Sequence, residues 1–254
     1  MPGPAPADVS ILFDALVFSM FMSLGALVAT EVWRKPFREL RLRDLGGPFA
    51  WLALGAWLSL VGWLAGRGFF TDFQQLPPRI LVAILPAVVV ILVLSLTRVM
   101  DGTLARIPAA ALVYLQSFRI VVEFVLWRLV AAGVAPEIMS FHGRNFDILV
   151  GLSAPVVAYC CFTRRLWPES VALWWNIAGI LVLLNTVVHA QLATPSPFRV
   201  FYTTPPNTFI AYPPYILLPA FLVPLAWFFH AMSIRQLLGR RRVSAGLRSL
   251  PGPP

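Results

Sequence analysis

The largely apolar stretch LQSFRIVVEFVLWR contains polar residues whose types suit a binding or proton-transfer site. Gln116, Arg119 and Glu123 fall, with Trp127, within about 80° of arc on a helix turning 100° per residue. Arg119 and Glu123 are four residues apart, which predicts that their charges meet on one helix face. Arg119 would then hold an anionic group or pair with Glu123.

A second polar group lies in the segment SFHGRNFDILVGLSAP. Arg144, Asn145 and Asp147 are candidate ligand-binding residues there, and His142 is a candidate acid–base residue. Asn145 and Asp147 are also residue types that cap the start of a helix. A turn followed by a helix N-terminus therefore explains the same residues without a ligand, and the sequence leaves both interpretations open.

Further along the chain, Asn185 and His189 repeat the four-residue spacing on one helix face. Most polar residues inside the predicted spans fall in the outer half of the bundle, which predicts a pocket open to the outside. An equally weighted interpretation is a buried ion pair that sets the helix register. The predicted ligand-binding residues are Arg119, Glu123, Gln116, Arg144, Asn145, Asp147, Asn185 and His189.

Metal and nucleophile motifs are not found in this sequence. His142, His189 and His230 lack metal-ligand spacing. The adjacent Cys160 and Cys161 are interpreted as packing residues. Neither a G-x-S-x-G elbow nor a phosphate-binding glycine loop occurs. We therefore predict no metal and no cofactor, and the sequence leaves open whether the protein is an enzyme.

The elements that position these residues are predicted to be transmembrane helices. The chain has 254 residues, of which 59% are hydrophobic and 12% charged, and its apolar blocks are long enough to cross a bilayer. The prediction is an all-α polytopic bundle forming one transmembrane domain over 1–254, with a basic cytoplasmic tail over 235–254. The predicted helices are 10–31, 49–66, 79–97, 107–132, 146–163, 170–190 and 213–234.

The basic residues predict the orientation of this bundle. Alternate connections and the tail hold fourteen of them, whereas the other connections hold Arg67, Arg79, Arg144 and Arg199. Basic residues concentrate on the cytoplasmic side of membrane proteins. Seven helices then place the N-terminus outside and the C-terminus in the cytoplasm. This distribution also argues against nucleic acid as a partner, although the net charge is +9.

The stretches LQSFRIVVEFVLW and SFHGRNFDILVGLSAP resemble segments of a family of uncharacterised bacterial multi-pass integral membrane proteins. The resemblance covers the middle third of the chain and implies the cytoplasmic (inner) membrane of a bacterium. It implies no activity. The positions that carry it are Gln116, Arg119, Glu123, Gly143, Arg144, Asn145, Asp147, Gly151 and Pro155.

Three functions remain as hypotheses. The leading one is an outward-facing binding or transporter-like protein for a small polar solute, although no paired half-repeats of the kind common in transporters are found. The second is a membrane-embedded enzyme acting at the outer leaflet. The third is a non-catalytic subunit or assembly factor that contacts a membrane-protein partner. In all three hypotheses the protein is embedded in a lipid bilayer.

Overall fold

The computed structural model describes residues 43–248, and within this range the chain is helical and contains no β-strand. The all-α prediction is confirmed for these residues, while the predicted first helix at 10–31 lies outside them. The α-helices are α2 (Arg43–Gly66), α3 (Ile80–Leu96), α4 (Asp101–Arg106), α5 (Ala109–Tyr114), α6 (Phe118–Ala131), α7 (Asp147–Ala158), α8 (Glu169–Ala193) and α9 (Val223–Arg248).

Short irregular turns extend three of these helices. A 3-10 turn, Leu115–Ser117, joins α5 to α6, so a single apolar helical path runs over Ala109–Ala131. A π-helical turn, Tyr159–Thr163, extends α7, and another, Leu218–Leu222, leads into α9. Turns of this kind open a helix locally and often occur at functional sites.

The last helix differs from its prediction. The sequence predicts a helix ending at 234 and a tail over 235–254, but α9 continues to Arg248. Hydropathy marks the end of an apolar span, whereas a helix can continue through polar residues that have a high helix propensity. Arg, Leu and Gln are good helix formers, and Leu237 is still buried in the core. The first fourteen residues of the predicted tail are therefore helical.

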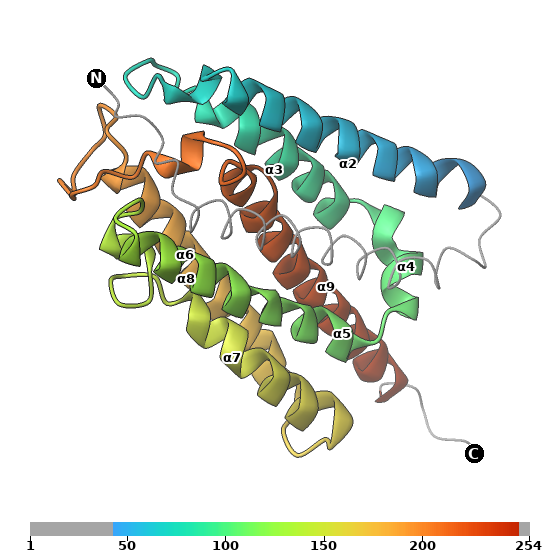
Figure 1. The fold of residues 1–254 in the computed structure, drawn as a ribbon. Coiled ribbons are helices and arrows are strands. Elements are labelled where there is room, and N and C mark those ends of the chain that lie inside the picture. Colours follow the sequence, from blue (N-terminus) through green and yellow to red (C-terminus); the bar gives the residue numbers. More distant parts are fainter. Residues whose placement is uncertain (1–42, 249–254) are drawn as a thin grey trace, which may run out of the picture.

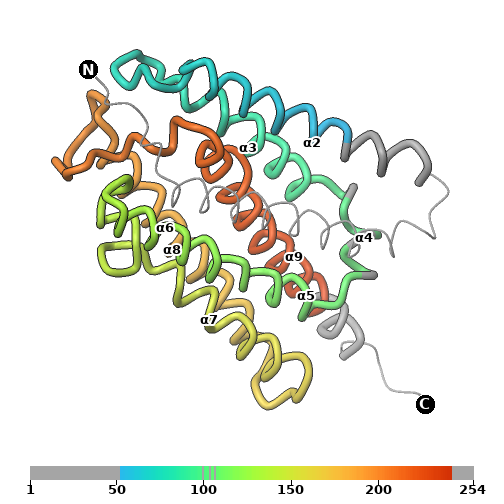
Figure 2. The backbone as a smooth tube through the Cα atoms, viewed as in Figure 1, coloured from blue at the N-terminus to red at the C-terminus, as the bar shows by residue number. Residues whose placement is uncertain are grey.

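The helices pack around α9, which contacts α3, α5 and α8 (Figure 1). Helix α2 shares an apolar cluster with α3 and with the π-helical turn Leu218–Leu222, and α7 packs against α6 and α8 (Figure 2). The connections 67–79, 132–146 and 194–217 lie at one end of the bundle, which we call the Asn145 end. The connections 97–108 and 164–168 lie at the other, which we call the Arg165 end.

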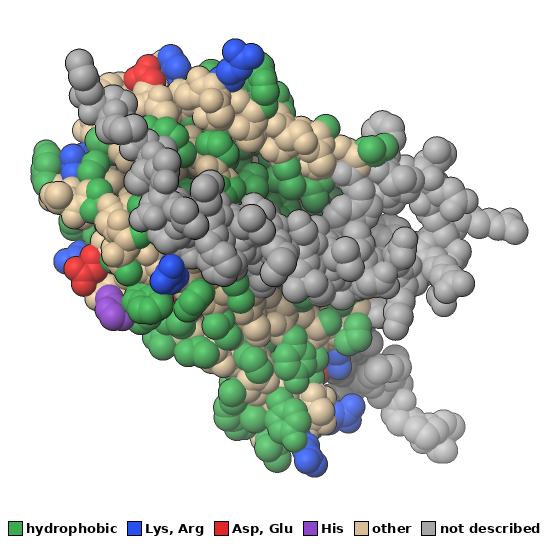
Figure 3. Space-filling model, in the orientation of Figure 1, with side chains coloured by type: hydrophobic (Ala, Val, Ile, Leu, Met, Phe, Trp, Pro, Cys, Tyr) green, Lys and Arg blue, Asp and Glu red, His purple; other side chains and the backbone are tan. Residues whose placement is uncertain are grey.

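Three helices of the described part of the chain are long and apolar enough to cross a membrane: Ala109–Ala131, Glu169–Ala193 and Leu218–Arg241. Shorter apolar helices occupy Leu52–Gly66, Ile80–Leu96 and Asp147–Thr163. Hydrophobic side chains cover much of the visible described surface, and charged ones gather toward the ends (Figure 3). This distribution is compatible with a membrane protein.

Apolar clusters pack on both sides of the polar residues of α6. Toward the Asn145 end, Val125 and Leu129 join a cluster with Phe209. Toward the Arg165 end, Leu112 and Met232 belong to another. The polar residues described next are therefore enclosed along the helix as well as around it.

Candidate functional site

Helix α6 directs two charged side chains into the bundle. Arg119 is 2% exposed and Glu123 is 1% exposed. They share one face of α6 because they are one helical turn apart. Charges without water must be paired or neutralised, since desolvation of an isolated ion is costly. The surroundings of these two side chains therefore decide what the site can do.

The ion pair of the site joins two helices. Arg119 Nη1 on α6 lies 2.9 Å from Asp147 Oδ1 at the start of α7. The sequence predicts instead that Arg119 meets Glu123 on its own helix. The preference for Asp147 follows from the close approach of the helices at Gly151, where an added Cβ would lie 2.9 Å from Ile120 Cγ1 and 3.3 Å from Arg119 Cβ. A small residue at this crossing lets α7 bring its carboxylate to Arg119.

Asn145 holds the rest of this group together. Its Nδ2 donates to Glu123 Oε1 and to the Met139 carbonyl, the latter at 3.0 Å. Its Oδ1 accepts from Thr186 Oγ1 of α8 at 2.8 Å and from the Asp147 backbone N–H at 3.1 Å. The last bond shows that Asn145 supports the start of α7, as its residue type indicates. One amide thus connects α6, α7 and α8.

Several buried atoms of this group lack a hydrogen-bond partner among the described residues. They are Arg119 Nε and Nη2, Glu123 Oε2 and Gln116 Oε1. Buried polar atoms are nearly always bonded in native proteins, and each one left unpaired needs an explanation. Here two donors and two acceptors lie on one face of the α5–α6 path, so a small molecule with both functions would satisfy them.

A second buried group lies between α8 and α9. His230 Nδ1 lies 2.8 Å from Asn176 Oδ1, and Asn176 Nδ2 donates to Ser233 Oγ at 2.9 Å. Gly179 makes room for the imidazole, because a Cβ there would lie 2.3 Å from His230 Cε1. His230 Nε2 has no partner among the described residues, so this group also has free hydrogen-bonding capacity.

Arg119 and Gln116 connect the two groups. The charge of Arg119 acts on Glu123, on Asp147 and on His230. Gln116 Nε2 donates to the Ala226 carbonyl of α9 at 3.1 Å, one turn before His230. We call the whole set the buried polar core; its members are Gln116, Arg119, Glu123, Asn145, Asp147, Asn176, Thr186, His230 and Ser233.

The remaining predicted residues lie elsewhere. Arg144 is exposed, with Nη1 3.5 Å from His189 Nε2 and its guanidinium over the Phe201 ring. Asn185 Nδ2 donates to the Arg144 carbonyl at 2.8 Å, and His189 stacks on Phe201. We call these four residues the Arg144 cluster. It contains three predicted site residues that the structure separates from Arg119 and Glu123.

Electrostatics limits what the buried polar core can bind. Arg119 carries one positive charge, and Glu123 and Asp147 together carry two negative charges when ionised. An added proton or a bound cation would balance them. Within residues 43–248, no three His, Cys, Asp or Glu side chains are grouped so as to hold a metal ion. With both carboxylates ionised, the site therefore carries one uncompensated negative charge.

The comparisons with known proteins identify a family. The model of a domain of unknown function, DUF8737, matches residues 77–238. The chain belongs to this family. No curated protein and no solved structure matches the chain. The matched region contains every residue of the buried polar core and of the Arg144 cluster, so both are set within the family's domain.

Sequence reasoning did not single out two members of the core, Thr186 and Ser233. It also did not predict that His230 would lie 2.8 Å from Asn176. Thr186 and Ser233 are polar residues in apolar stretches of α8 and α9, and this was the available signal in the sequence. Thr186 directly follows Asn185, so one step along α8 separates a residue of the Arg144 cluster from one in the core.

Proposed function

We propose that this member of the family is a multi-pass protein of the cytoplasmic membrane of a bacterium. Support comes from the three long and three shorter apolar helices and from exposed hydrophobic side chains along them. The predicted seven-helix count, with the N-terminus outside, adds a helix at 10–31 to these. The Arg165 end would face the cytoplasm because basic residues concentrate there.

We further propose that the buried polar core binds a small polar solute, as in an outward-facing binding or transporter-like protein. The observation that carries this proposal is the unpartnered hydrogen-bonding capacity of Arg119 and Glu123, both almost fully buried. Arg119 would donate to an acceptor of the solute. Glu123 would accept from a donor or carry a proton itself.

The enclosure of the core constrains this function. The sequence predicts a pocket open to the outside, whereas Arg119, Glu123 and Asn145 are all at most 2% exposed. Entry of a solute would therefore require movement at the Asn145 end, where the connections 132–146 and 194–217 cover the bundle. The Arg144 cluster joins these two connections to α8 through Asn185 and His189, so we assign it to access and not to direct solute contact.

A thermal-stability screen tests the proposal. Purified protein is heated with small polar metabolites and monovalent ions, beside Glu123→Gln and the control Glu137→Gln, which alters an exposed carboxylate at the same end. A solute that binds only the folded protein raises the unfolding midpoint with its concentration. We expect a hit that disappears in Glu123→Gln and persists in Glu137→Gln.

The opposite pattern would reject solute binding. If no compound stabilises the wild type, and Glu123→Gln is clearly less stable than Glu137→Gln, the core only holds helices together. The same result would favour the hypothesis of a non-catalytic subunit.

A further inference from the structure

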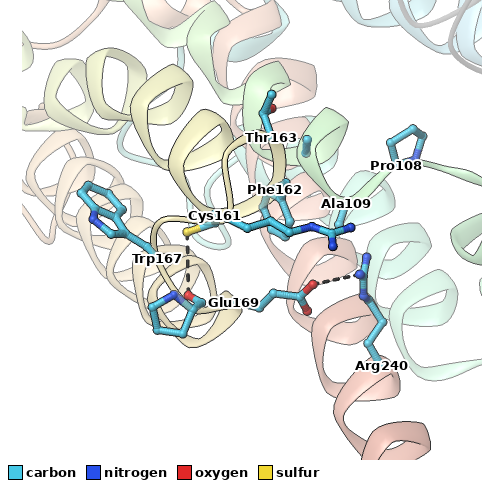
Figure 4. A pocket seen from close by; sticks show the side chains of 11 residues that line it. Pro108, Ala109, Cys161, Phe162, Thr163, Trp167, Glu169 and Arg240 are labelled. Atoms are coloured by element: carbon cyan, nitrogen blue, oxygen red, sulfur yellow. Dashed lines mark hydrogen bonds and ion pairs between the residues drawn. The ribbon is translucent and has the colours of Figure 1, made fainter.

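A separate pocket of about 630 Å³ lies at the Arg165 end of the bundle. Three segments line it: the start of α5, the π-helical turn that ends α7 with its connection to α8, and α9 (Figure 4). The lining includes Cys161, Arg165, Trp167, Glu169 and Arg240. None of these belongs to the buried polar core.

The charges of this pocket are unequal. Arg240 Nη2 pairs with Glu169 Oε1 at 2.8 Å, as the dashed line in Figure 4 shows. The exposed Arg165 guanidinium has no bonded partner among the described residues. One acidic residue thus faces two basic ones, and the pocket keeps a positive charge. A planar guanidinium presents several donors in a fork that matches phosphate oxygens.

The backbone holds Arg165 in an unusual conformation. Its φ is 54°, a left-handed value that residues other than glycine seldom adopt. The flanking backbone is fixed, since the Leu166 and Trp167 N–H groups both donate to the Cys160 carbonyl, at 2.8 and 3.2 Å. An arginine at a position that would suit glycine puts its side chain at a defined place beside the pocket.

The surroundings of the pocket match a phospholipid better than a soluble anion. Leu166 is 70% exposed and Trp174, one turn into α8, is 67% exposed. Trp167 is partly exposed, and tryptophan prefers the interface between headgroups and hydrocarbon. Exposed apolar side chains also run along α7 and into its π-helical turn, toward the pocket; they are Leu149, Leu152, Val156 and Tyr159.

We propose that this pocket binds the phosphate headgroup of an anionic phospholipid, with Arg165 as its principal ligand and the acyl chains along α7 and α8. Arg240, which pairs with Glu169, would add a second positive charge beside the headgroup. This inference rests on the proposal that the bundle spans a membrane. It does not depend on solute binding in the buried polar core.

The test compares short-chain phosphatidylglycerol, short-chain phosphatidylcholine and inorganic phosphate as stabilisers of the full-length purified protein. The test variants are Arg165→Gly and Arg165→Asn, since glycine and asparagine tolerate a positive φ and folding should be retained. The control is Arg67→Gln, which removes an exposed arginine from the opposite end. Glu123→Gln is run alongside to separate this site from the core.

We expect phosphatidylglycerol to raise the unfolding midpoint of the wild type more than phosphatidylcholine does, and inorganic phosphate to have no effect. The apparent affinity for phosphatidylglycerol should fall about fivefold in both Arg165 variants. It should be unchanged in Arg67→Gln and Glu123→Gln.

Three results would overturn the inference. Equal affinity of the wild type and the Arg165 variants for phosphatidylglycerol would show that Arg165 does not bind the headgroup. An equal loss in Arg67→Gln would show an effect of net charge alone. Protection by inorganic phosphate that depends on Arg165 would identify a site for soluble phosphate compounds in place of lipid.

Discussion

The two polar groups at the Asn145 end are neighbours in sequence but differ in what holds them. Arg144 and Asn145 are consecutive, yet Asn145 is bonded inside the bundle and Arg144 lies on its surface. Inside, each polar contact replaces lost hydration and is costly to break. Outside, water replaces any contact that is lost. Polar contacts on the two sides of one peptide bond therefore contribute different free energies to folding.

The largest effect should come from breaking the buried ion pair. Asp147→Ala leaves the Arg119 charge without its partner in a dry site, which we expect to lower the free energy of unfolding by about 3–5 kcal/mol. Chemical or detergent denaturation of the purified protein measures this change. The double variant Arg119→Met, Asp147→Leu should recover most of the loss. A single-variant loss below about 1 kcal/mol would mean that water reaches the pair.

Crowding the second buried group should have the next largest effect. Gly179→Ala places a methyl group 2.3 Å from His230 Cε1, so we expect a loss of about 1–3 kcal/mol from overpacking. Gly62→Ala on α2 is a matched control, because nothing lies within 4 Å of its Cβ position. If His230→Ala fails to relieve the Gly179→Ala defect, the clash is not with the imidazole.

Removing a single hydrogen bond of the buried polar core should have a smaller effect. Thr186→Val keeps the side-chain shape but removes the donor to Asn145 Oδ1. Interhelical hydrogen bonds in membrane bundles contribute about 0.6 kcal/mol on average, and we expect a loss of this size. A loss as large as that of Asp147→Ala would show that Asn145 positions the whole core and acts as more than one contact.

The smallest effect is expected in the Arg144 cluster. Arg144→Ala removes contacts to His189 and Phe201 at an exposed site, which should change the free energy of unfolding by at most about 1 kcal/mol. The rate of solute association should change, while the equilibrium midpoint shift in the thermal screen should stay the same, because it depends on the dissociation constant and not on access. A loss above about 2 kcal/mol would show that the Arg144 cluster stabilises the fold as strongly as contacts of the buried polar core do.

Sequence patterns predicted the helices well where apolar spans and helix ends coincide. The structure places α3 at Ile80–Leu96, beside the predicted 79–97, and continuous helix over 109–131, beside 107–132. They predicted α9 poorly because its polar C-terminal half is helical for reasons of propensity and packing. The seven-helix count and the orientation stay predictions, since helix 10–31 lies outside the described residues.

The sequence pointed to five of the nine members of the buried polar core but not to their arrangement. Gln116, Arg119, Glu123, Asn145 and Asp147 could be chosen because buried polar side chains in apolar helices are costly and hence few. Helical spacing pairs Arg119 with Glu123, since it describes neighbours on one helix only. It says nothing of a carboxylate that another helix brings 2.9 Å away.

The sequence by itself determined that this chain forms apolar helices with a small number of polar side chains, because hydropathy and helical period are local properties. Only the tertiary structure decided which of these side chains meet. Gly151 and Gly179 let backbones and rings approach where larger residues would collide, and this packing joins Arg119 to Asp147 and His230 to Asn176. It also separates Arg144 from Asn145, because the backbone turn between them sends one side chain to the surface and the other to the core.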